Sequence, residues 1–333
     1  MKEALFWKKL KDKDVQCTLC PNFCVIKENK TGSCKVRKNI KGKLYSLVYS
    51  HPCSVAVDPI EKKPFYHFLP GTKVFSIGTA GCNLHCAFCQ NYSISQVSFD
   101  ETAPYDIEPE DVVEQAIKNN CKTIAYTYNE PTIFYEYMLE IAKVAKKKGL
   151  KNVIVSNGFI NEEPLKKLIP LIDGANIDLK SFDNDFYKKI ALARLEPVLK
   201  TLKILHENKV WLEITNLIIP TLNDNIKDIE KMVKWIKENL DENVPLHFSA
   251  FFPMFKLANI PATKTETLLK AKNMAEESLN YVYVGNIISE NSNTMCPKCR
   301  KMVLSRIGFE VLYNKIKKGE CYNCGEKIPG IWE

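Results

Sequence analysis

The chain has 333 residues, of which 45% are hydrophobic and 26% are charged, and this composition excludes a disordered or fibrous protein. Its formal charge of +8 comes from lysines spread along the chain, so charge alone does not indicate a nucleic-acid-binding protein. No apolar run approaches the roughly 18 residues that span a bilayer, and the N-terminus lacks the apolar stretch of a secretory signal. We therefore expect a cytoplasmic protein without a membrane partner.

Cysteines are the most informative residues, because eleven of the thirteen fall into three groups. In a reducing compartment, grouped cysteines bind metal more often than they form disulfides. The first group lies in an expected N-terminal cysteine-rich segment, residues 1–70, and consists of Cys17, Cys20, Cys24 and Cys34. Its C-x2-C-x3-C-x9-C spacing suits either zinc or an auxiliary iron–sulfur cluster. In both cases the metal would mainly fold a segment that has little core of its own.

The middle of the chain, residues 71–290, alternates apolar β-branched runs with amphipathic stretches. The runs predict strands at 74–80, 123–128, 152–156, 175–179, 210–218 and 246–251, with an additional one at 281–284. Helices are expected between them, one ending at Gly149 and one that Pro197 breaks or restarts. Thr263 and Glu266 have the spacing of a capping box before the last helix.

Near-continuous apolar strands separated by helices indicate a parallel sheet that is buried on both faces. The pattern is compatible with a doubly wound sheet or with a full or partial barrel. In each case, functional residues are expected where the strands end at their carboxyl ends.

The loop after the first of these strands reads Gly81-Cys82-Asn83-Leu84-His85-Cys86-Ala87-Phe88-Cys89-Gln90-Asn91. Three thiolates at C-x3-C-x2-C spacing can hold three irons of a [4Fe–4S] cluster and leave the fourth iron open. The alternative is a zinc site that takes His85 as its fourth ligand, which this strand–loop–helix setting disfavours.

The third cysteine group lies in an expected C-terminal module, residues 291–333, and consists of Cys296, Cys299, Cys321 and Cys324. Its C-x2-C-x21-C-x2-C spacing is typical of a zinc ribbon or rubredoxin-like site, so we predict bound zinc or, less expected, iron. Four thiolates leave no open position, so this metal would not perform the chemistry.

The cluster motif, with aromatic Phe88 before the last cysteine, resembles the signature of the radical S-adenosylmethionine (SAM) superfamily. Further segments resemble the AmmeMemoRadiSam-system radical SAM enzymes, which are relatives of pyruvate formate-lyase activating enzyme. These segments are Cys17–Pro21, Asp58–Pro64, Gly78–Cys82, Tyr126–Thr132, Asp178–Lys180 and Gly330–Trp332. The resemblance implies a partial (β/α)6 barrel of parallel strands, flanked here by the two four-cysteine modules.

The resemblance also implies reductive cleavage of SAM at the [4Fe–4S] cluster to methionine and a 5′-deoxyadenosyl radical. Residues expected to contact this cosubstrate are Phe88, Gln90, Asn129, Glu130, Asn157, Asp178 and Lys180. Glu130 or nearby backbone carbonyls would accept hydrogen bonds from the methionine ammonium, because a desolvated ammonium needs acceptors. Alternatively, Asn129 caps the helix that Pro131 opens, and Asn157 is a turn residue. Phe252 stands where relatives often carry a histidine, and we expect His247 to be a hydrogen-bonded core residue.

Three functions remain open on the sequence. The leading one is a radical SAM enzyme that abstracts hydrogen from an unidentified substrate, for which a macromolecule and a small metabolite are both candidates. A narrower one is a glycyl-radical activase. The third is a zinc-ribbon nucleic-acid-binding protein, which is disfavoured because metal binding by all three groups would reduce the net charge to about +3. An enzyme of this kind needs a flavodoxin- or ferredoxin-like electron donor, and the resemblance implies association with Memo-like and Amme-type proteins.

Overall fold

The computed structural model describes residues 1–287 and 292–333, and its centre is an eight-stranded sheet ordered β14-β13-β12-β11-β10-β9-β8-β7. The strands are β7 (Ser54–Pro59), β8 (Lys73–Gly78), β9 (Thr123–Tyr126), β10 (Lys151–Ser156), β11 (Gly174–Asp178), β12 (Trp211–Ile218), β13 (Leu246–Ala250) and β14 (Val282–Gly285). Strands β8 to β14 are parallel to their neighbours, whereas β7 is antiparallel to β8. The expected α/β class with a parallel sheet is confirmed, and the additional run at 281–284 forms β14.

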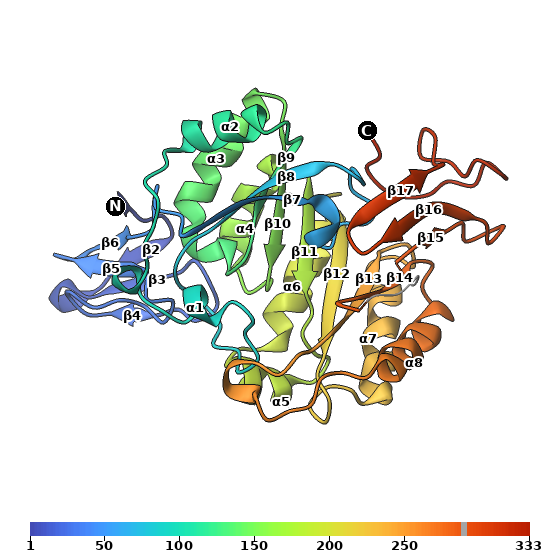
Figure 1. The fold of residues 1–333 in the computed structure, drawn as a ribbon. Helices are drawn as coiled ribbons and strands as arrows, with labels where there is room; N and C mark the ends of the chain where they lie inside the picture. Colours follow the sequence, from blue (N-terminus) through green and yellow to red (C-terminus); the bar gives the residue numbers. More distant parts are fainter. Residues whose placement is uncertain (288–291) are drawn as a thin grey trace.

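Amphipathic helices follow the strands and cover the sheet (Figure 1). The longer ones are α2 (Pro109–Lys118), α3 (Tyr135–Lys147), α4 (Glu162–Leu168), α6 (Leu195–Glu207), α7 (Ile226–Asn239) and α8 (Thr265–Glu276). As predicted, Gly149 follows the end of α3 as its C′ residue, with a φ of +77°. Of the two roles expected for Pro197, the break is wrong and the restart is confirmed, because this proline lies in the first turn of α6, where its missing N–H costs no helical hydrogen bond.

Short helical segments complete the connections between the strands. They are α1 (Tyr92–Ser95), α5 (Asn184–Phe186), η1 (Lys11–Lys13), η2 (Ile60–Lys62), η3 (Phe99–Glu101), η4 (Pro131–Phe134), η5 (Ile169–Leu171), η6 (Tyr187–Ala191) and η7 (Phe255–Leu257). No described helix has both the length and the apolar character that crossing a membrane would require.

The expected capping box at Thr263 is wrong. Helix α8 begins after Lys264 and has no side-chain cap. The Thr263 hydroxyl instead accepts a hydrogen bond from Phe251 N at 2.9 Å and donates one to Ile218 O at 2.5 Å. Thr263 therefore joins the carboxyl ends of β12 and β13. Its hydroxyl satisfies one backbone group at each strand end and is not available to cap the helix.

The barrel is partial, because within residues 1–287 and 292–333 no pairing joins β14 to β7. The segment that follows β7 fills the interior, where Phe65 and Phe68 pack with side chains of β8, β9 and β10. The last residues of the chain hold this segment in place. Leu69 N donates to Ile331 O at 2.6 Å, and Ile331 N donates to His67 O at 2.7 Å.

Small antiparallel sheets flank the barrel on opposite sides in Figure 1. The N-terminal ones combine β1 (Lys2–Glu3), β6 (Lys43–Ser46) and β5 (Arg37–Ile40), and β2 (Trp7–Lys9), β3 (Val15–Cys17) and β4 (Val25–Ile26). The β1-β6-β5 sheet is fastened to α3 by a buried ion pair of 3.0 Å between Arg37 of β5 and Glu136. The segment that we expected to precede the core also supplies β7 to the main sheet.

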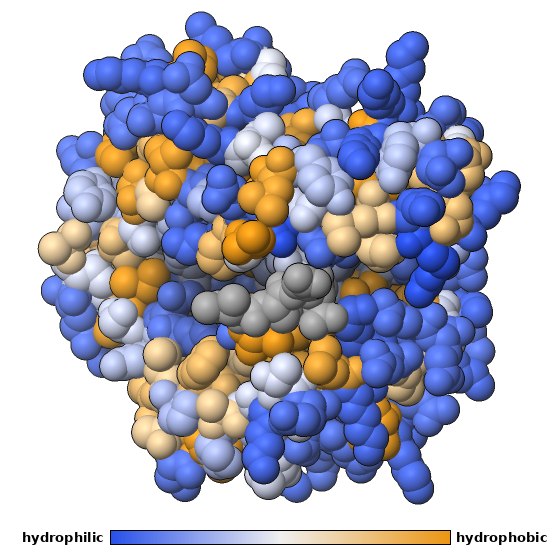
Figure 2. All heavy atoms as spheres, turned by 45° about the vertical axis from the view of Figure 1, so that its right-hand side comes forward, coloured by the Kyte–Doolittle hydropathy of each residue, from blue (hydrophilic) through white to orange (hydrophobic). Residues whose placement is uncertain are grey.

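The C-terminal sheet consists of β15 (Thr294–Met295), β16 (Met302–Ile307) and β17 (Glu310–Asn314). The buried Arg306 donates one hydrogen bond within this sheet, to Thr294 Oγ1, and attaches the sheet to the barrel by donating another to Tyr66 O. Its hairpin exposes the apolar residues Ile307, Phe309, Leu312 and Tyr313. The face in Figure 2 is mostly hydrophilic, with several hydrophobic patches. The expected boundary between residues 290 and 291 lies outside the described residues.

Candidate active site

A cavity of about 550 Å³ opens at the carboxyl ends of the parallel strands, where ligands bind in sheets of this kind. Its volume lies within the range of small-molecule sites. The sequence-predicted residues that line it are Cys82, Cys86, Cys89, Phe88, Gln90, Asn129, Asn157, Asp178 and Lys180. The structure therefore brings together loops that are up to about 100 residues apart in the sequence.

The loop between β8 and α1 places the three cysteine thiols of the motif at this cavity. Cys82 and Cys86 are buried and Cys89 is half-buried. The Cys82 sulfur accepts a hydrogen bond from Leu84 N at 3.4 Å, and the Cys89 sulfur lies 3.0 Å from Ser95 Oγ. The three thiols do not form a set whose members all lie within 4.8 Å of one another. Three thiols at one cavity can each bind a different iron of a cubane.

His85 is not directed at the thiols, which leaves the alternative zinc site without its fourth ligand. Its Nε2 lies 2.7 Å from Ser33 Oγ, and its Nδ1 lies 2.9 Å from Gln96 Oε1. Both ring nitrogens are thus engaged outside the cysteine set. His85 instead fastens the cysteine loop to its surroundings.

The turn after β9 joins this loop through Asn129. Its side-chain amide donates to Gly81 O at 2.7 Å, and its Oδ1 accepts from Thr79 N at 3.3 Å. The preceding residue, Tyr128, has a φ of +70°. Asn129 does not cap the helical turn that Pro131 opens, because Glu130 does so by accepting from Thr132 N.

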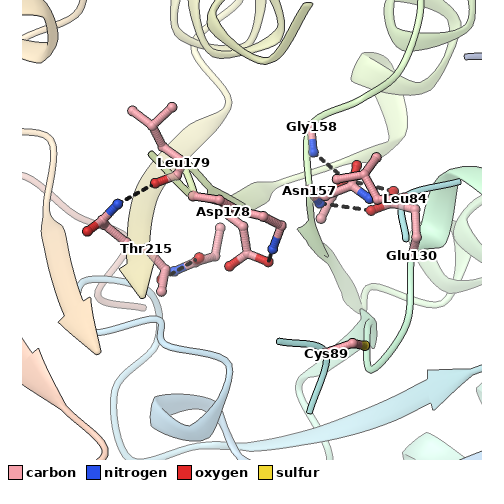
Figure 3. A network of polar contacts seen from close by, with 12 residues as sticks. Leu84, Cys89, Glu130, Asn157, Gly158, Asp178, Leu179 and Thr215 are labelled. Atoms are coloured by element: carbon pink, nitrogen blue, oxygen red, sulfur yellow. Dashed lines mark hydrogen bonds and ion pairs between the residues drawn. The ribbon is translucent and has the colours of Figure 1, made fainter. Parts of the chain in front are cut away.

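Glu130 is the one residue expected to contact cosubstrate that does not line the cavity. Its buried carboxylate accepts hydrogen bonds from Thr132 N and Oγ1, Ser156 Oγ and Asn157 N, at 2.6 to 3.0 Å. Burial raises its pKa, and these donors oppose that rise. Glu130 therefore joins the turns after β9 and β10 (Figure 3).

Asn157 faces both the cavity and the cysteine loop. Its Nδ2 donates to Asn83 Oδ1 at 2.9 Å and lies 3.8 Å from the Cys82 sulfur. Its Oδ1 accepts from Phe159 N at 2.9 Å, which is the turn role considered for the sequence. Both interpretations of Asn157 therefore hold together.

Asp178 and Lys180 form an ion pair of 3.0 Å at the end of β11. Burial disfavours the Lys180 ammonium, but the neighbouring Asp178 carboxylate outweighs it, so the pKa of Lys180 lies above its ordinary value. The Lys180 ammonium also lies 5.5 Å from the centre of the Phe88 ring. In Figure 3, Asp178 lies across the site from Glu130 and Asn157.

Residues 58–64 contribute cavity-lining groups that sequence reasoning treated only as a family mark. Lys63 lies 2.7 Å from the Asp58 carboxylate, and Tyr128 OH donates to the same carboxylate at 2.8 Å. The Lys63 ammonium also lies 4.4 Å from the centre of the Tyr128 ring. The cluster of charges in Asp58-Pro59-Ile60-Glu61-Lys62-Lys63 was the signal that could have identified a lining segment.

His247 is a buried, hydrogen-bonded residue, as predicted, and it also lines the cavity. Its Nε2 lies 2.6 Å from the carboxylate of Glu213, which also accepts from Tyr66 N and His67 N. Phe252 is 47% exposed and is not among the lining residues. At position 252, where relatives often carry a histidine, this chain therefore has no side chain that lines the cavity.

The C-terminal cysteines form a compact metal-binding arrangement. Within the described ranges, this is the only set of three or more His, Cys, Asp or Glu side chains whose ligand atoms all lie within 4.8 Å of one another. The Cys296 and Cys324 sulfurs are 3.6 Å apart, and those of Cys299 and Cys321 are 3.7 Å apart. Tetrahedral zinc with Zn–S bonds of about 2.3 Å requires a separation of about 3.8 Å.

Comparisons with known proteins identify the superfamily to which this chain is similar. The profile of the radical SAM superfamily matches residues 76–236. An uncharacterised protein of Methanocaldococcus jannaschii is 46% identical over 332 residues, which cover 98% of this chain and 99% of that protein. The pyruvate formate-lyase-activating enzyme of Clostridium pasteurianum is 24% identical over 217 residues, 60% of this chain and 88% of that enzyme.

A similar fold occurs in the crystal structure of Streptococcus suis SuiB bound to S-adenosylmethionine. The TM-score is 0.51 at 14% sequence identity, and the similarity covers 68% of this chain and 53% of SuiB. At this identity the similarity concerns the fold alone.

Proposed function

The chain belongs to the radical SAM superfamily of enzymes, and on that premise we propose that it binds a [4Fe–4S] cluster through Cys82, Cys86 and Cys89. When bound, the cluster supplies the electron that cleaves SAM to methionine and a 5′-deoxyadenosyl radical. The enzyme then abstracts hydrogen from a substrate. The observation that carries this proposal is the position of the three thiols at one side of a cavity whose other sides are polar strand ends.

Different lining residues would bind different groups of SAM. Lys180 presents a cation that can meet the methionine carboxylate, and Asp178 presents an acceptor beside it. The turn at residues 127–129 lines the cavity close to the cysteine loop, where its backbone carbonyls can accept from the methionine ammonium. Glu130 acts through that turn, because its own carboxylate is fully engaged within the protein.

We propose a macromolecular substrate, such as a peptide loop. Phe309 of the C-terminal hairpin and residues 61–64 of the segment after β7 also line the cavity. Both elements can contact a bulky substrate without taking part in the chemistry. The similarity to an activating enzyme that acts on a protein supports the same class.

A glycyl-radical activase is the narrower form of this proposal. A flavodoxin- or ferredoxin-like protein would supply the electron. Memo-like and Amme-type proteins are candidates for association on the family resemblance described for the sequence.

The first test concerns the catalytic cluster. Anaerobically reconstituted protein is expected to show the EPR signal of a reduced [4Fe–4S] cluster that changes when SAM is added, because SAM ligates the open iron. The triple variant Cys82→Ala, Cys86→Ala, Cys89→Ala should lose this SAM-sensitive signal. A triple variant with the unchanged signal would show that the assignment is wrong.

The second test concerns the substrate. Reduced enzyme is incubated with SAM and deuterated cellular protein, and 5′-deoxyadenosine is examined by mass spectrometry. Deuterium in 5′-deoxyadenosine is expected from the protein fraction, because the radical takes hydrogen from its substrate. Label that appears only with the low-molecular-weight fraction would contradict a macromolecular substrate and leave the radical chemistry intact.

A further inference from the structure

The four N-terminal cysteines surround a small apolar cavity that has no part in the proposed function. Cys17, Cys20, Cys24 and Cys34 all line it, together with Arg37 of β5 and Asn83 of the catalytic cysteine loop. All four are free thiols. Cys17 N donates a hydrogen bond to Cys24 O at 3.0 Å, which brings the backbones of the first and third cysteines together. The cavity therefore has thiols as its only titratable lining groups apart from Arg37.

The spacing of these thiols differs from that of the C-terminal set. The C-terminal sulfurs approach to 3.6 and 3.7 Å, as a single tetrahedral ion requires. In the N-terminal set, which is fully described, no three sulfurs all lie within 4.8 Å of one another. All four thiols line one cavity, and such a set can hold a [4Fe–4S] cluster, in which each thiolate binds its own iron.

A buried donor without a partner points to the same kind of ligand. Arg37 is 2% exposed; its Nη1 donates to Glu136 and its Nη2 to Leu5 O, but its Nε has no acceptor within the described parts of the chain. Such an orphaned buried donor is costly and rare in folded proteins. An anionic cluster in the adjoining cavity would supply both a sulfur acceptor and a charge that the guanidinium favours.

The N-terminal cysteine loop packs directly against the catalytic one. A Cβ atom placed on Gly81 would lie 2.3 Å from Cys34 O, so the two backbones touch immediately before Cys82. Asn22 Nδ2 donates to Asn83 O at 2.8 Å, and Ser33 Oγ lies 2.7 Å from His85 Nε2. Cys20 and Cys24 are half-buried, whereas Cys17 and Cys34 are buried.

We propose that Cys17, Cys20, Cys24 and Cys34 bind a second [4Fe–4S] cluster, through which electrons reach the catalytic cluster. A reduced flavodoxin- or ferredoxin-type protein gives one electron to this cluster, which passes it to the cluster at Cys82, Cys86 and Cys89. The donor is oxidised and the catalytic cluster is reduced, and no bond or proton changes place. Electron delivery rests on the proposed function, whereas cluster binding at the N-terminal site does not.

Metal content tests the binding step. Wild-type protein purified without oxygen should contain about eight iron and eight acid-labile sulfide ions per chain, with zinc only at the C-terminal site. Cys17→Ser together with Cys34→Ser should lose about half of both, whereas the control variants Cys53→Ser and Cys121→Ser should keep them. If the double variant does not fold, native mass spectrometry and Mössbauer spectra of the wild type still test the proposal, because they count the iron–sulfur clusters per chain directly. About four iron and two zinc ions in the wild type would overturn the proposal.

The triple variant of Cys82, Cys86 and Cys89 separates this proposal from the proposed function. It should retain about four iron ions and an EPR signal that does not respond to SAM. A triple variant without iron would overturn the N-terminal cluster, whereas one with all the wild-type iron would overturn the catalytic assignment.

Stopped-flow reduction tests electron delivery. Reduction of the catalytic cluster by reduced flavodoxin should be slower by more than an order of magnitude in the double variant than in the wild type. Reduction by dithionite should be unchanged, because this small anion reaches the open cavity directly. Equal rates with flavodoxin in both proteins would overturn the delivery role.

Discussion

Two carboxylates beside the cavity differ in what surrounds them. Glu130 is completely buried, and all its hydrogen-bond partners belong to the turns after β9 and β10. The side chain of Asp178 is 35% exposed and is paired with Lys180 at the cavity wall. Glu130 is therefore a positioning residue, whereas Asp178 is available to a ligand.

Replacement of these two carboxylates should separate stability from binding. Glu130→Ala leaves several buried donors unsatisfied, so we expect a loss of about 2–4 kcal/mol of unfolding free energy together with loss of SAM cleavage. Asp178→Asn should weaken SAM binding without lowering the melting temperature. Both are measured by thermal denaturation and by SAM titration of the cluster EPR signal, with Glu114→Gln as an exposed control. Equal stability losses in both variants would contradict the distinction.

The direction of these side chains could not be derived from the sequence. Glu130 and Asp178 both follow apolar runs at strand ends, and this placement was predicted correctly. Tyr128, two residues before Glu130, has a positive φ of +70°, which changes the path of the chain just before that carboxylate. A left-handed tyrosine has no sequence signal, because such a conformation is unfavourable unless the fold imposes it.

At the scale of the elements, the loop between β8 and α1 depends on Gly81. This residue has a φ of +85°, and a side chain there would collide with Cys34 O and Val36. Gly149 has a similar φ of +77°, but a side chain there would meet nothing within 4 Å. The two glycines share the same backbone requirement and differ only in the contact between the two cysteine loops.

Alanine substitutions of these glycines therefore form a matched pair. Gly149→Ala should cost about 1 kcal/mol, which is the backbone penalty alone. Gly81→Ala should cost several times as much and lower the iron content, because the two loops must separate. Iron analysis and thermal denaturation measure both effects. Similar losses in the two variants would mean that the close contact is unimportant.

The strands could be predicted from the sequence, whereas the buried side-chain contacts between distant segments could not. Apolar β-branched runs predicted every parallel strand, because strands buried on both faces need continuous hydrophobicity. The buried network around Glu213 was not anticipated, although one charged residue within the run 210–218 indicated an internal partner. Its partners, Tyr66, His67 and His247, come from three other parts of the chain, and no local pattern links them.

At the scale of the whole molecule, His67 couples stability to pH. It lies between Tyr283 OH at 2.6 Å and Pro329 O at 2.7 Å, where the barrel meets the C-terminal module. Burial lowers its pKa from 6.5 to about 4. In this interval the unfolded chain binds a proton that the folded protein does not, so stability falls as the pH decreases from 6.5 toward 4.

The His67→Gln variant should reduce this dependence. Between pH 7 and pH 5 the wild type should lose about 2 kcal/mol of unfolding free energy from this residue, and the variant should lose correspondingly less. Denaturant titrations at the two pH values measure the difference, with His206→Gln as the control. Parallel pH profiles for wild type and His67→Gln would exclude His67 as the cause.

The C-terminal metal should support the fold without entering the chemistry. Cys321→Ser is expected to lower the zinc content and the melting temperature, because the hydrophobic core of the module is too small to hold its fold without the metal. SAM should still change the EPR signal of the reduced cluster in this variant. Unchanged zinc content in Cys321→Ser would contradict the site.

The pairing of Phe68 with Ile331 has a consequence for biosynthesis. About 260 residues separate the two partners, so at ribosomal speeds the first waits roughly 15–50 s for the second. During translation the catalytic cysteines emerge early, while the interior of the barrel still lacks the C-terminal residue that holds residues 67–69. Closure of the barrel interior is therefore a late event, which follows the synthesis of the catalytic cysteines by most of the chain.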